Sequence, residues 1–188
     1  YTKEAYEAKK YAFVSDYVRL WALEREGGLY MDVDFEVYKS FDDLLQYSAF
    51  AGYEGSKYHP VMMGVIAAEA HHPWIYRMMA TYENRHFLIP DGTLDLTPNT
   101  GYFLKWMHKQ GLVADGVEKD WKNVHILPVE CFCPVLTTGE NLRCERTYCE
   151  HMGLHSWSRD RGWKTKVLNI FTPTWRIKLI TLKRKLMG

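Results

Sequence analysis

The sequence contains no apolar run that approaches the roughly 20 residues needed to cross a bilayer. No charged start followed by an apolar stretch marks a signal peptide either. An excess of charge of one sign is also lacking, because 24 basic and 23 acidic side chains leave a formal net charge of only +1. Such a balance provides no overall field that would attract nucleic acid. We therefore expect a cytoplasmic protein that does not bind nucleic acid.

Cysteine is scarce, and all four cysteines lie late in the chain, at Cys131, Cys133, Cys144 and Cys149. The first pair is spaced too tightly for the common zinc knuckle, which uses C-x₂₋₄-C. It also lies in an apolar run that reads as a strand, where small thiols are usually buried. We expect buried free thiols in a reduced protein, with a zinc site and a structural disulfide as the alternatives.

Helical and strand patterns alternate along the chain, and 47% hydrophobic residues can fill the core of one domain spanning residues 1–188. The expected helices cover residues 4–26, 41–47, 73–86 and 102–110, and the expected strands cover residues 29–32, 35–38, 49–53, 61–67, 124–127 and 131–136. This alternation predicts an α/β fold with a mainly parallel, Rossmann-type sheet flanked by helices.

The last segment, residues 173–188, is basic and amphipathic. Its apolar residues recur at helical spacing: Trp175, Leu179, Leu182 and Leu186. Arginine and lysine occupy most of the remaining positions. We expect a basic C-terminal helix that docks on the domain. The alternative is a peripheral contact with an anionic membrane at its inner face.

The most informative stretch is GGLYMDVD, which begins at Gly27. Gly27 and Gly28 can adopt the positive φ that ends a helix, and the apolar residues after them favour a short strand. Asp32 and Asp34 follow, two residues apart. In an extended backbone their carboxylates would point to one face and reach one divalent cation. Such oxygen ligands suit Mg²⁺ or Mn²⁺, which complete their shells with water and substrate phosphate oxygens.

The helix before this stretch has an apolar stripe and a polar set of residues beside it. The stripe predicts the buried face of the helix and consists of Val14, Tyr17, Val18 and Trp21. Ser15, Asp16 and Arg19 lie off the stripe, with Ser15 and Arg19 one turn apart. By themselves, Asp16 and Arg19 would form an ordinary surface ion pair worth a few tenths of a kcal/mol, as a rough figure.

Taken together, Ser15-Asp16-x-x-Arg19 and Gly27-Gly28-x-Tyr30-x-Asp32-x-Asp34 resemble the sugar-binding region with a DXD motif of glycosyltransferase family 32. Fungal mannosyltransferases and bacterial capsule and lipopolysaccharide transferases are members. The resemblance is close over residues 12–37. Weaker landmarks continue in the family's order to Asn99, His151 and Ser156-Trp157.

The resemblance implies a GT-A-like fold and a metal-dependent transfer of sugar, with retention of anomeric configuration, from a UDP- or GDP-sugar to a saccharide or lipid-linked acceptor. It places the reaction in surface polysaccharide or lipopolysaccharide biosynthesis. Asp32 and Asp34 are implied as catalytic, and Asp34 and His151 as ligands of Mn²⁺ or Mg²⁺. The implied substrate-binding residues are Ser15, Asp16, Arg19, Tyr30, Asp32, Asn99, Ser156 and Trp157.

The chain opens directly into a helical stretch, whereas family members usually begin upstream with a strand that helps hold the nucleotide base. We therefore expect these 188 residues to be the C-terminal majority of a longer protein. No obvious carboxylate offers a covalent nucleophile, since we expect Glu36 and Glu54 on exposed strand positions. This favours a front-face displacement, in which the acceptor hydroxyl attacks on the leaving-group side.

Two other classes of function stay open. An Asp-x-Asp phosphatase or phosphotransferase would use Asp32 and Asp34 as nucleophile and acid, but usually requires a hydroxyl residue two places later, where this chain has Glu36. The third class is a non-catalytic sugar-binding fragment.

Overall fold

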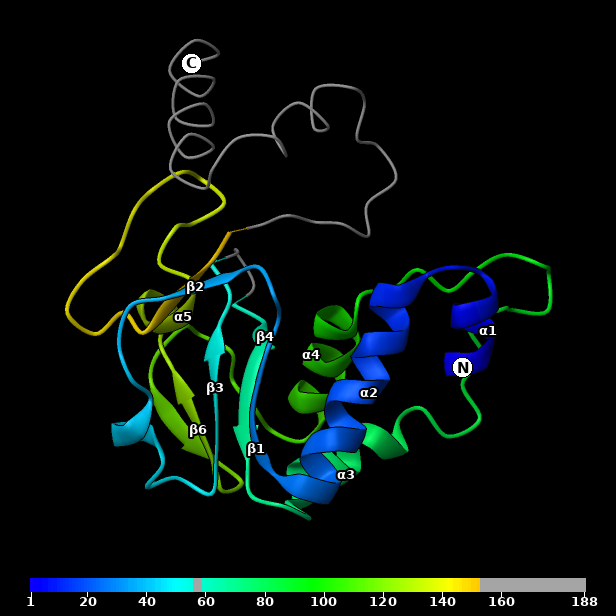
Figure 1. Cartoon of the computed structure of the whole chain (residues 1–188), viewed down its shortest axis with the longest axis horizontal. Coiled ribbons are helices and arrows are strands. Elements are labelled where there is room, and N and C mark those ends of the chain that lie inside the picture. Colours follow the sequence, from blue (N-terminus) through cyan, green and yellow to red (C-terminus); the bar gives the residue numbers. More distant parts are fainter. Residues whose placement is uncertain (56–58, 153–188) are drawn as a thin grey trace, which may run out of the picture. The chain divides into compact units, whose positions relative to one another are not determined.

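A five-stranded sheet with helices packed on one face forms the centre of the computed structural model, which describes residues 1–55 and 59–152 (Figure 1). The helices are α1 (Thr2–Glu7), α2 (Tyr11–Glu26), α3 (Pro73–Ala80), α4 (Asn99–Lys109), α5 (Val129–Phe132) and the 3₁₀ turn η1 (Asp42–Leu44). The strands are β1 (Gly28–Met31), β2 (Phe35–Val37), β3 (Ala49–Tyr53), β4 (Val61–Ala68), β5 (Lys119–Trp121), β6 (Val124–Leu127) and β7 (Cys149–His151). Residues 1–151 make one compact unit.

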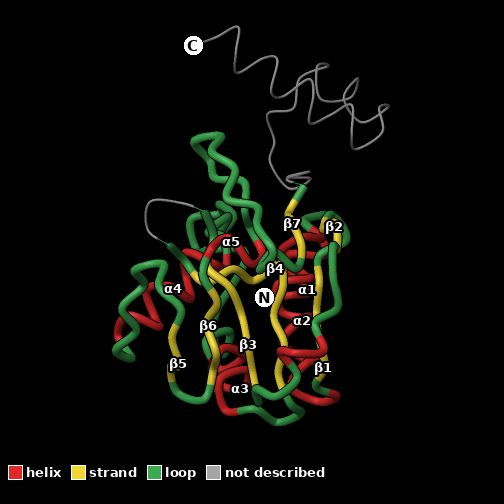
Figure 2. Tube along the Cα trace, turned by 90° about the vertical axis from the view of Figure 1, so that its left-hand side faces the viewer, coloured by secondary structure: helices red, strands yellow, loops and turns green. Residues whose placement is uncertain are grey.

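The strands of the main sheet follow the order β1-β4-β3-β6-β5, which Figure 2 shows edge to edge. Only β3 and β6 are parallel, and the other three neighbouring pairs are antiparallel. The α/β class is thus confirmed, but the expectation of a mainly parallel sheet is wrong for the described residues. For β5 and β6 the reason is a short connection, because the turn at Lys122 and Asn123, both with positive φ, can join only antiparallel neighbours.

The two faces of the sheet are covered differently. Helices α2, α3 and α4 pack on one face, where Leu20, Ile75 and Phe103 are fully buried. The other face packs against η1, α5 and β7 through residues such as Phe132 and Tyr148. A separate two-stranded ribbon pairs β2 with β7 in antiparallel register. This ribbon brings the end of the described chain to the segment that follows β1.

Helix α2 buries a different face from the one that its apolar stripe predicts. Leu20 and Leu23 face the core, together with Arg19 at 6% exposure, whereas Val18 and Trp21 are 47% and 45% exposed. The prediction is wrong because the spacing of apolar residues does not show that Arg19 is buried. Its polar partners are Met63 on β4 and Asp32 after β1. The motif residues therefore lie on the inner side of the helix, and part of the apolar stripe lies outside.

Several element boundaries also differ from expectation. The helix over residues 4–26 is broken into α1 and α2 around Lys9, which has a positive φ of 56°. Residues 41–47 contain only the single turn η1, and the helix from Pro73 ends at Ala80. Residues 131–136 do not form a strand, because Cys131 belongs to α5. No described helix is both long and apolar enough to span a membrane, and the helix expected over residues 173–188 lies outside the described residues.

The four cysteines are free, as expected. Cys131 and Cys149 are buried, and burial raises the pKa of each thiol to about 12. Cys144, by contrast, is exposed. Within residues 1–55 and 59–152 no group of cysteines and other ligands could hold a metal ion. The zinc and disulfide alternatives therefore find no support in the structure.

The carboxylate of Glu4 fastens α1 to the loop after α3. It accepts hydrogen bonds from the backbone N–H groups of Phe87 and Leu88 at 2.6 and 3.0 Å, and lies 2.8 Å from Nδ1 of His86. The interactions with His86 and the two amides lower the pKa of Glu4 from 4.5 to about 2. This carboxylate therefore stabilises the fold in its ionised form.

We expect Glu4→Gln to lower the melting temperature at pH 7, because the depressed pKa means that ionised Glu4 contributes stability above its unfolded value of 4.5. The contribution disappears as the pH falls through 4.5 toward about 2, where the variant and the natural chain should melt alike. Thermal unfolding followed by circular dichroism across this range tests it. Glu7→Gln, an exposed change on the same helix, serves as the control; equal melting temperatures at pH 7 would refute the prediction.

Candidate functional site

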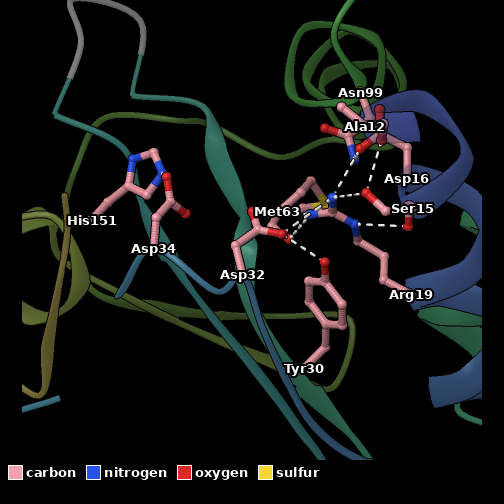
Figure 3. Close-up of polar contacts among 10 residues, drawn as sticks. All are labelled: Ala12, Ser15, Asp16, Arg19, Tyr30, Asp32, Asp34, Met63, Asn99 and His151. Atoms are coloured by element: carbon pink, nitrogen blue, oxygen red, sulfur yellow. Dashed lines mark hydrogen bonds and ion pairs between the residues drawn. The ribbon is translucent and has the colours of Figure 1, made fainter. Parts of the chain in front are cut away.

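Arg19 is the centre of a buried polar network between α2 and the strands (Figure 3). Its Nη1 donates to the Met63 carbonyl on β4 at 2.6 Å. Its Nη2 lies 3.0 Å from Oδ1 of Asp16 and 3.4 Å from Oδ1 of Asp32. One guanidinium therefore joins the helix, the end of β1 and the middle of β4, and its charge is shared between two carboxylates.

The helical spacing of the motif gives Arg19 its local support. Nε of Arg19 donates to the Ser15 carbonyl and Nη2 to the Ser15 hydroxyl, both at 3.2 Å. The Ser15 hydroxyl in turn donates to the Ala12 carbonyl at 2.8 Å. Residues one turn apart on a helix can make such contacts. The expected ion pair between Asp16 and Arg19 is present, but it is buried rather than on the surface.

Tyr30 and Asp32 lie on the same side of the chain at the end of β1. The Tyr30 hydroxyl donates to Oδ1 of Asp32 at 2.6 Å, and the guanidinium of Arg19 lies 4.6 Å from the centre of the Tyr30 ring. Burial raises the pKa of Tyr30, so the hydroxyl stays protonated and remains a donor. The side chain of Asp32 is 31% exposed. Tyr30 and Arg19 thus hold the Asp32 carboxylate, and the rest of the side chain is accessible to solvent.

Gly64 on β4 provides the space that Asp32 occupies, and the motif analysis missed it. The Gly64 carbonyl accepts from the Asp32 backbone N–H at 2.8 Å. A Cβ at position 64 would lie 3.0 Å from Oδ2 of Asp32 and 2.9 Å from the Phe35 ring. A single glycine inside an apolar strand often marks such a close approach. The sequence of β4, VMMGVIAA, shows this pattern, with one glycine among apolar residues.

Asn99 and Asp16 come from distant segments and meet at the edge of the network. Asn99, 7% exposed in the first turn of α4, donates from Nδ2 to Oδ1 of Asp16 at 2.9 Å. Burial raises the pKa of Asp16 to about 6, although the positive charge of Arg19 opposes this rise. The site therefore holds a carboxylate that is largely, but not fully, ionised at neutral pH.

Asp34 and His151 form a second polar group beside the first. The β2–β7 ribbon carries His151 to the segment after β1, where its Nε2 lies 3.2 Å from Oδ2 of Asp34. The side chain of His151 is 30% exposed, and that of Asp34 is 13% exposed. Burial lowers the pKa of His151, but the hydrogen bond with Asp34 and the nearby carboxylates outweigh it, and the net shift is upward.

The carboxylates of the two motif aspartates point toward different side chains. The Asp32 carboxylate points toward Tyr30 and Arg19, whereas that of Asp34 points toward His151 (Figure 3). The expectation that both carboxylates extend from one face of a strand is wrong, because residues 33–34 form a turn rather than extended backbone. Asp32 and Asp34 thus lie close in sequence but serve two neighbouring polar groups.

Residues 1–51 match the family model described as "Glycosyltransferase sugar-binding region containing DXD motif". The amino-terminal part of the chain is therefore similar to a DXD-type glycosyltransferase region. A segment of 48 residues, 26% of the chain, is 46% identical to the Glucan organizing enzyme 1 of Cryptococcus neoformans var. grubii. The match spans only 13% of that relative. No solved structure matches the chain.

The side chains of Asp34 and His151 provide part of the ligand set of a hard divalent cation. Asp34 and His151 offer one carboxylate and one imidazole whose nearest atoms are 3.2 Å apart. Over residues 1–55 and 59–152, no group of three or more such side chains could hold a metal ion. Manganese and magnesium commonly take few protein ligands and complete their shells with substrate phosphate and water. The pair suits a cation that a diphosphate brings with it.

Glu54 is a further carboxylate close enough to His151 to feel its charge. It follows β3 and is half-buried. Burial raises the pKa of Glu54 to about 7, against the attraction of His151. The expectation of an exposed position is therefore wrong for Glu54, whereas Glu36 is indeed exposed. The expected residues Ser156 and Trp157 lie outside the described residues.

Proposed function

We propose that the chain carries the donor site of a glycosyltransferase that moves a sugar from a UDP- or GDP-sugar to a saccharide or lipid-linked acceptor. The observation that carries the proposal is the buried network in which Arg19 joins Asp16, Asp32 and the Met63 carbonyl. Arg19 lies on α2 and is only 6% exposed, so its charge is buried at a cost that an ordinary surface ion pair does not carry. The match of residues 1–51 to a sugar-binding region supports this interpretation.

The position of the network in the fold also supports the proposal. Ligands of open α/β sheets bind beyond the carboxyl ends of strands. Asp32 and Asp34 follow the carboxyl end of β1, with helices packed on one face of the sheet. We therefore propose a GT-A-like arrangement despite the mixed strand directions.

In this proposal the residues around Arg19 recognise the donor sugar. Asp16 accepts hydrogen bonds from sugar hydroxyls, Arg19 donates to them, and the amide of Asn99 fixes the direction of the Asp16 carboxylate. Ser15 acts through Arg19, and Tyr30 holds Asp32 in place. The resemblance assigns Ser156 and Trp157 to closure over the diphosphate.

Asp34 and His151 would hold Mn²⁺ or Mg²⁺, and such a cation, when bound, offsets the negative charge that develops on a departing diphosphate. The carboxylate of Asp32 lies next to this pair but is committed to Tyr30 and Arg19. That commitment argues against Asp32 as the nucleophile of a phosphatase. We favour transfer with retention by front-face displacement, in which the leaving phosphate oxygen takes the proton of the acceptor hydroxyl.

We also propose that the reaction belongs to surface polysaccharide or lipopolysaccharide assembly at the cytoplasmic face of a membrane. The fungal relative is named for glucan organisation, which is consistent with polysaccharide chemistry. The basic residues of segment 173–188 would supply a peripheral membrane contact.

Calorimetry with UDP- and GDP-sugars, with and without Mn²⁺, tests the donor site. We expect binding that depends on Mn²⁺ and weakens roughly tenfold or more in Asp34→Ala, because one of two protein ligands is lost. Asp42→Ala, a change at an exposed aspartate, should bind as the natural chain does.

Three results would separate the alternatives. Failure of every donor to bind would contradict the proposal. Binding without transfer would identify a non-catalytic sugar-binding fragment. Hydrolysis of a simple phosphate ester that Asp32→Asn abolishes would favour the phosphatase class. Where transfer occurs, the anomeric configuration of the product, read by NMR, distinguishes retention from inversion.

A further inference from the structure

Arg85 is a partly buried arginine that lies outside the segment matched by the family model. Its side chain is 9% exposed. Nε and Nη2 both donate to Oδ2 of Asp95, at 3.0 and 2.7 Å. Oδ1 of Asp95 accepts from the Thr97 backbone N–H at 3.1 Å. Arg85 therefore fixes the chain just before α4 begins at Asn99.

The same guanidinium also contacts α4 itself. It lies 4.3 Å from the centre of the Tyr102 ring, and Tyr102 is one helical turn beyond Asn99. The rings of Tyr1 and Tyr82 lie 4.8 and 5.2 Å from it on other sides. A cation over aromatic faces is attracted by their negative quadrupole. Arg85 thus holds the first turn of α4 on both sides of Asn99.

We propose that Arg85 is a positioning residue of the donor site: it fixes the first turn of α4 so that the Asn99 amide meets the Asp16 carboxylate. The proposal rests on the proposed function, since Asp16 is the expected acceptor for sugar hydroxyls. Arg85 itself does not touch the substrate in this proposal. It acts through Asp95, Tyr102 and Asn99.

One part of the Arg85 guanidinium adds nothing to the stability of the fold through hydrogen bonds. Its Nη1 is buried without a hydrogen-bond partner among residues 1–55 and 59–152, and so is the hydroxyl of Tyr82. A buried donor without a partner is unfavourable for folding. Local costs of this kind tend to be retained where a site needs a particular geometry. The position next to the Asp16–Asn99 pair provides such a need.

Charge provides a second link between Arg85 and Asp16. The groups around Asp16 are Arg19 on its own helix, Asp32 after β1, Asn99 on α4 and Arg85 after α3. Two tyrosines, Tyr1 and Tyr82, also face this region and respond to its charges. Burial raises the pKa of Asp16 to about 6, and the positive charges of Arg19 and Arg85 oppose the rise. Loss of Arg85 should therefore raise the pKa of Asp16 further.

The two links predict different behaviour for two variants. Arg85→Met removes both the charge and the bonds to Asp95, so we expect a higher titration midpoint for Asp16 and roughly tenfold weaker donor binding. Arg85→Lys keeps the charge but loses the two-pronged contact with Asp95. In Arg85→Lys the titration midpoint of Asp16 should stay close to that of the natural chain. Donor binding should be almost as weak as in Arg85→Met. Arg77→Met, at an exposed arginine on α3, is the control for both readouts.

Carbon-13 NMR titration of the Asp16 carboxyl and calorimetric donor binding are the measurements. A double-mutant cycle with Asn99→Ala decides whether Arg85 acts through Asn99. We expect the double variant to bind donor about as weakly as either single variant. Losses that multiply to roughly a hundredfold would overturn the proposal, as would unchanged binding in Arg85→Met.

Two further outcomes keep the test decisive. If Arg85→Met does not fold, the charge-retaining Arg85→Lys still carries the prediction of weaker binding with a preserved Asp16 midpoint, and natural affinity in that variant would overturn the proposal. If the natural chain binds no donor, the proposed function fails. The NMR titration still tests the influence of the Arg85 charge on Asp16, because it needs no donor, and an unchanged midpoint in Arg85→Met refutes that influence.

Discussion

Arg19→Met should destabilise the chain by about 3–5 kcal/mol, as expected when one partner of a buried charge network is removed. The Met63 carbonyl loses a 2.6 Å hydrogen bond, and Asp16 loses the guanidinium that lies 3.0 Å from it. Since Arg19 is only 6% exposed, water cannot readily replace these partners. A loss of this size is a large fraction of the total stability of a typical domain.

Urea unfolding at pH 7 measures the effect of Arg19→Met as a shift in midpoint. Arg25→Met is a matched control, because Arg25 lies exposed at the end of the same helix. The control should change stability by no more than about 0.5 kcal/mol. A change of less than about 1 kcal/mol in Arg19→Met would contradict the view that this network is buried and tightly coupled.

Asp16→Asn should have the opposite effect on stability while it weakens donor binding. Burial raises the pKa of Asp16 from 3.8 to about 6, so the folded state binds more protons than the unfolded state between these values. Stability therefore falls as the pH rises through this window and is constant above it. Asparagine resembles the protonated side chain, and should stabilise the fold by up to about 3 kcal/mol at pH 7.

The pH dependence identifies the cause of that gain. The natural chain and Asp16→Asn should have similar stability near pH 4 and diverge up to about pH 6. Urea unfolding at several pH values, with Asp42→Asn as an exposed control, measures this. Donor affinity should fall roughly tenfold or more, since a charged acceptor becomes a neutral one. A variant that is less stable than the natural chain at pH 7 would show that Asp16 contributes as a structural ion pair.

Local spacing predicted the part of the site that lies within one stretch of chain. Ser15 and Arg19 are one turn apart on a helix, and Tyr30 and Asp32 are two residues apart at the end of β1, where side chains at this spacing share a face, so their contacts follow from backbone geometry. His151 joined the expected site only through the family resemblance. Its contact with Asp34 depends on the β2–β7 ribbon, which no local pattern specifies.

The errors have a common physical source in long-range packing. Alternation of helices and strands does not determine which strands become neighbours, and β1 pairs in antiparallel register with β4 rather than with the next strand in sequence, so the parallel sheet was mispredicted. The apolar stripe through Val18 and Trp21 failed because buried partners from β1 and β4 turned Arg19 inward. Gly64 and Arg85 act through contacts with residues far away in sequence. Only a folded backbone brings these residues to the site.

The edge position of β1 has a practical consequence for handling the protein. Among the described residues β1 pairs with β4 alone, and its sequence, Gly-Leu-Tyr-Met, contains no charged residue or proline. Leu29 on this edge and Trp21 on α2 are 40% and 45% exposed. Natural proteins usually block such edges with charge, proline or a bulge, because a free edge recruits strands from other molecules. We therefore expect the uncharged edge of β1 to be a site at which copies of this chain associate when the protein is concentrated.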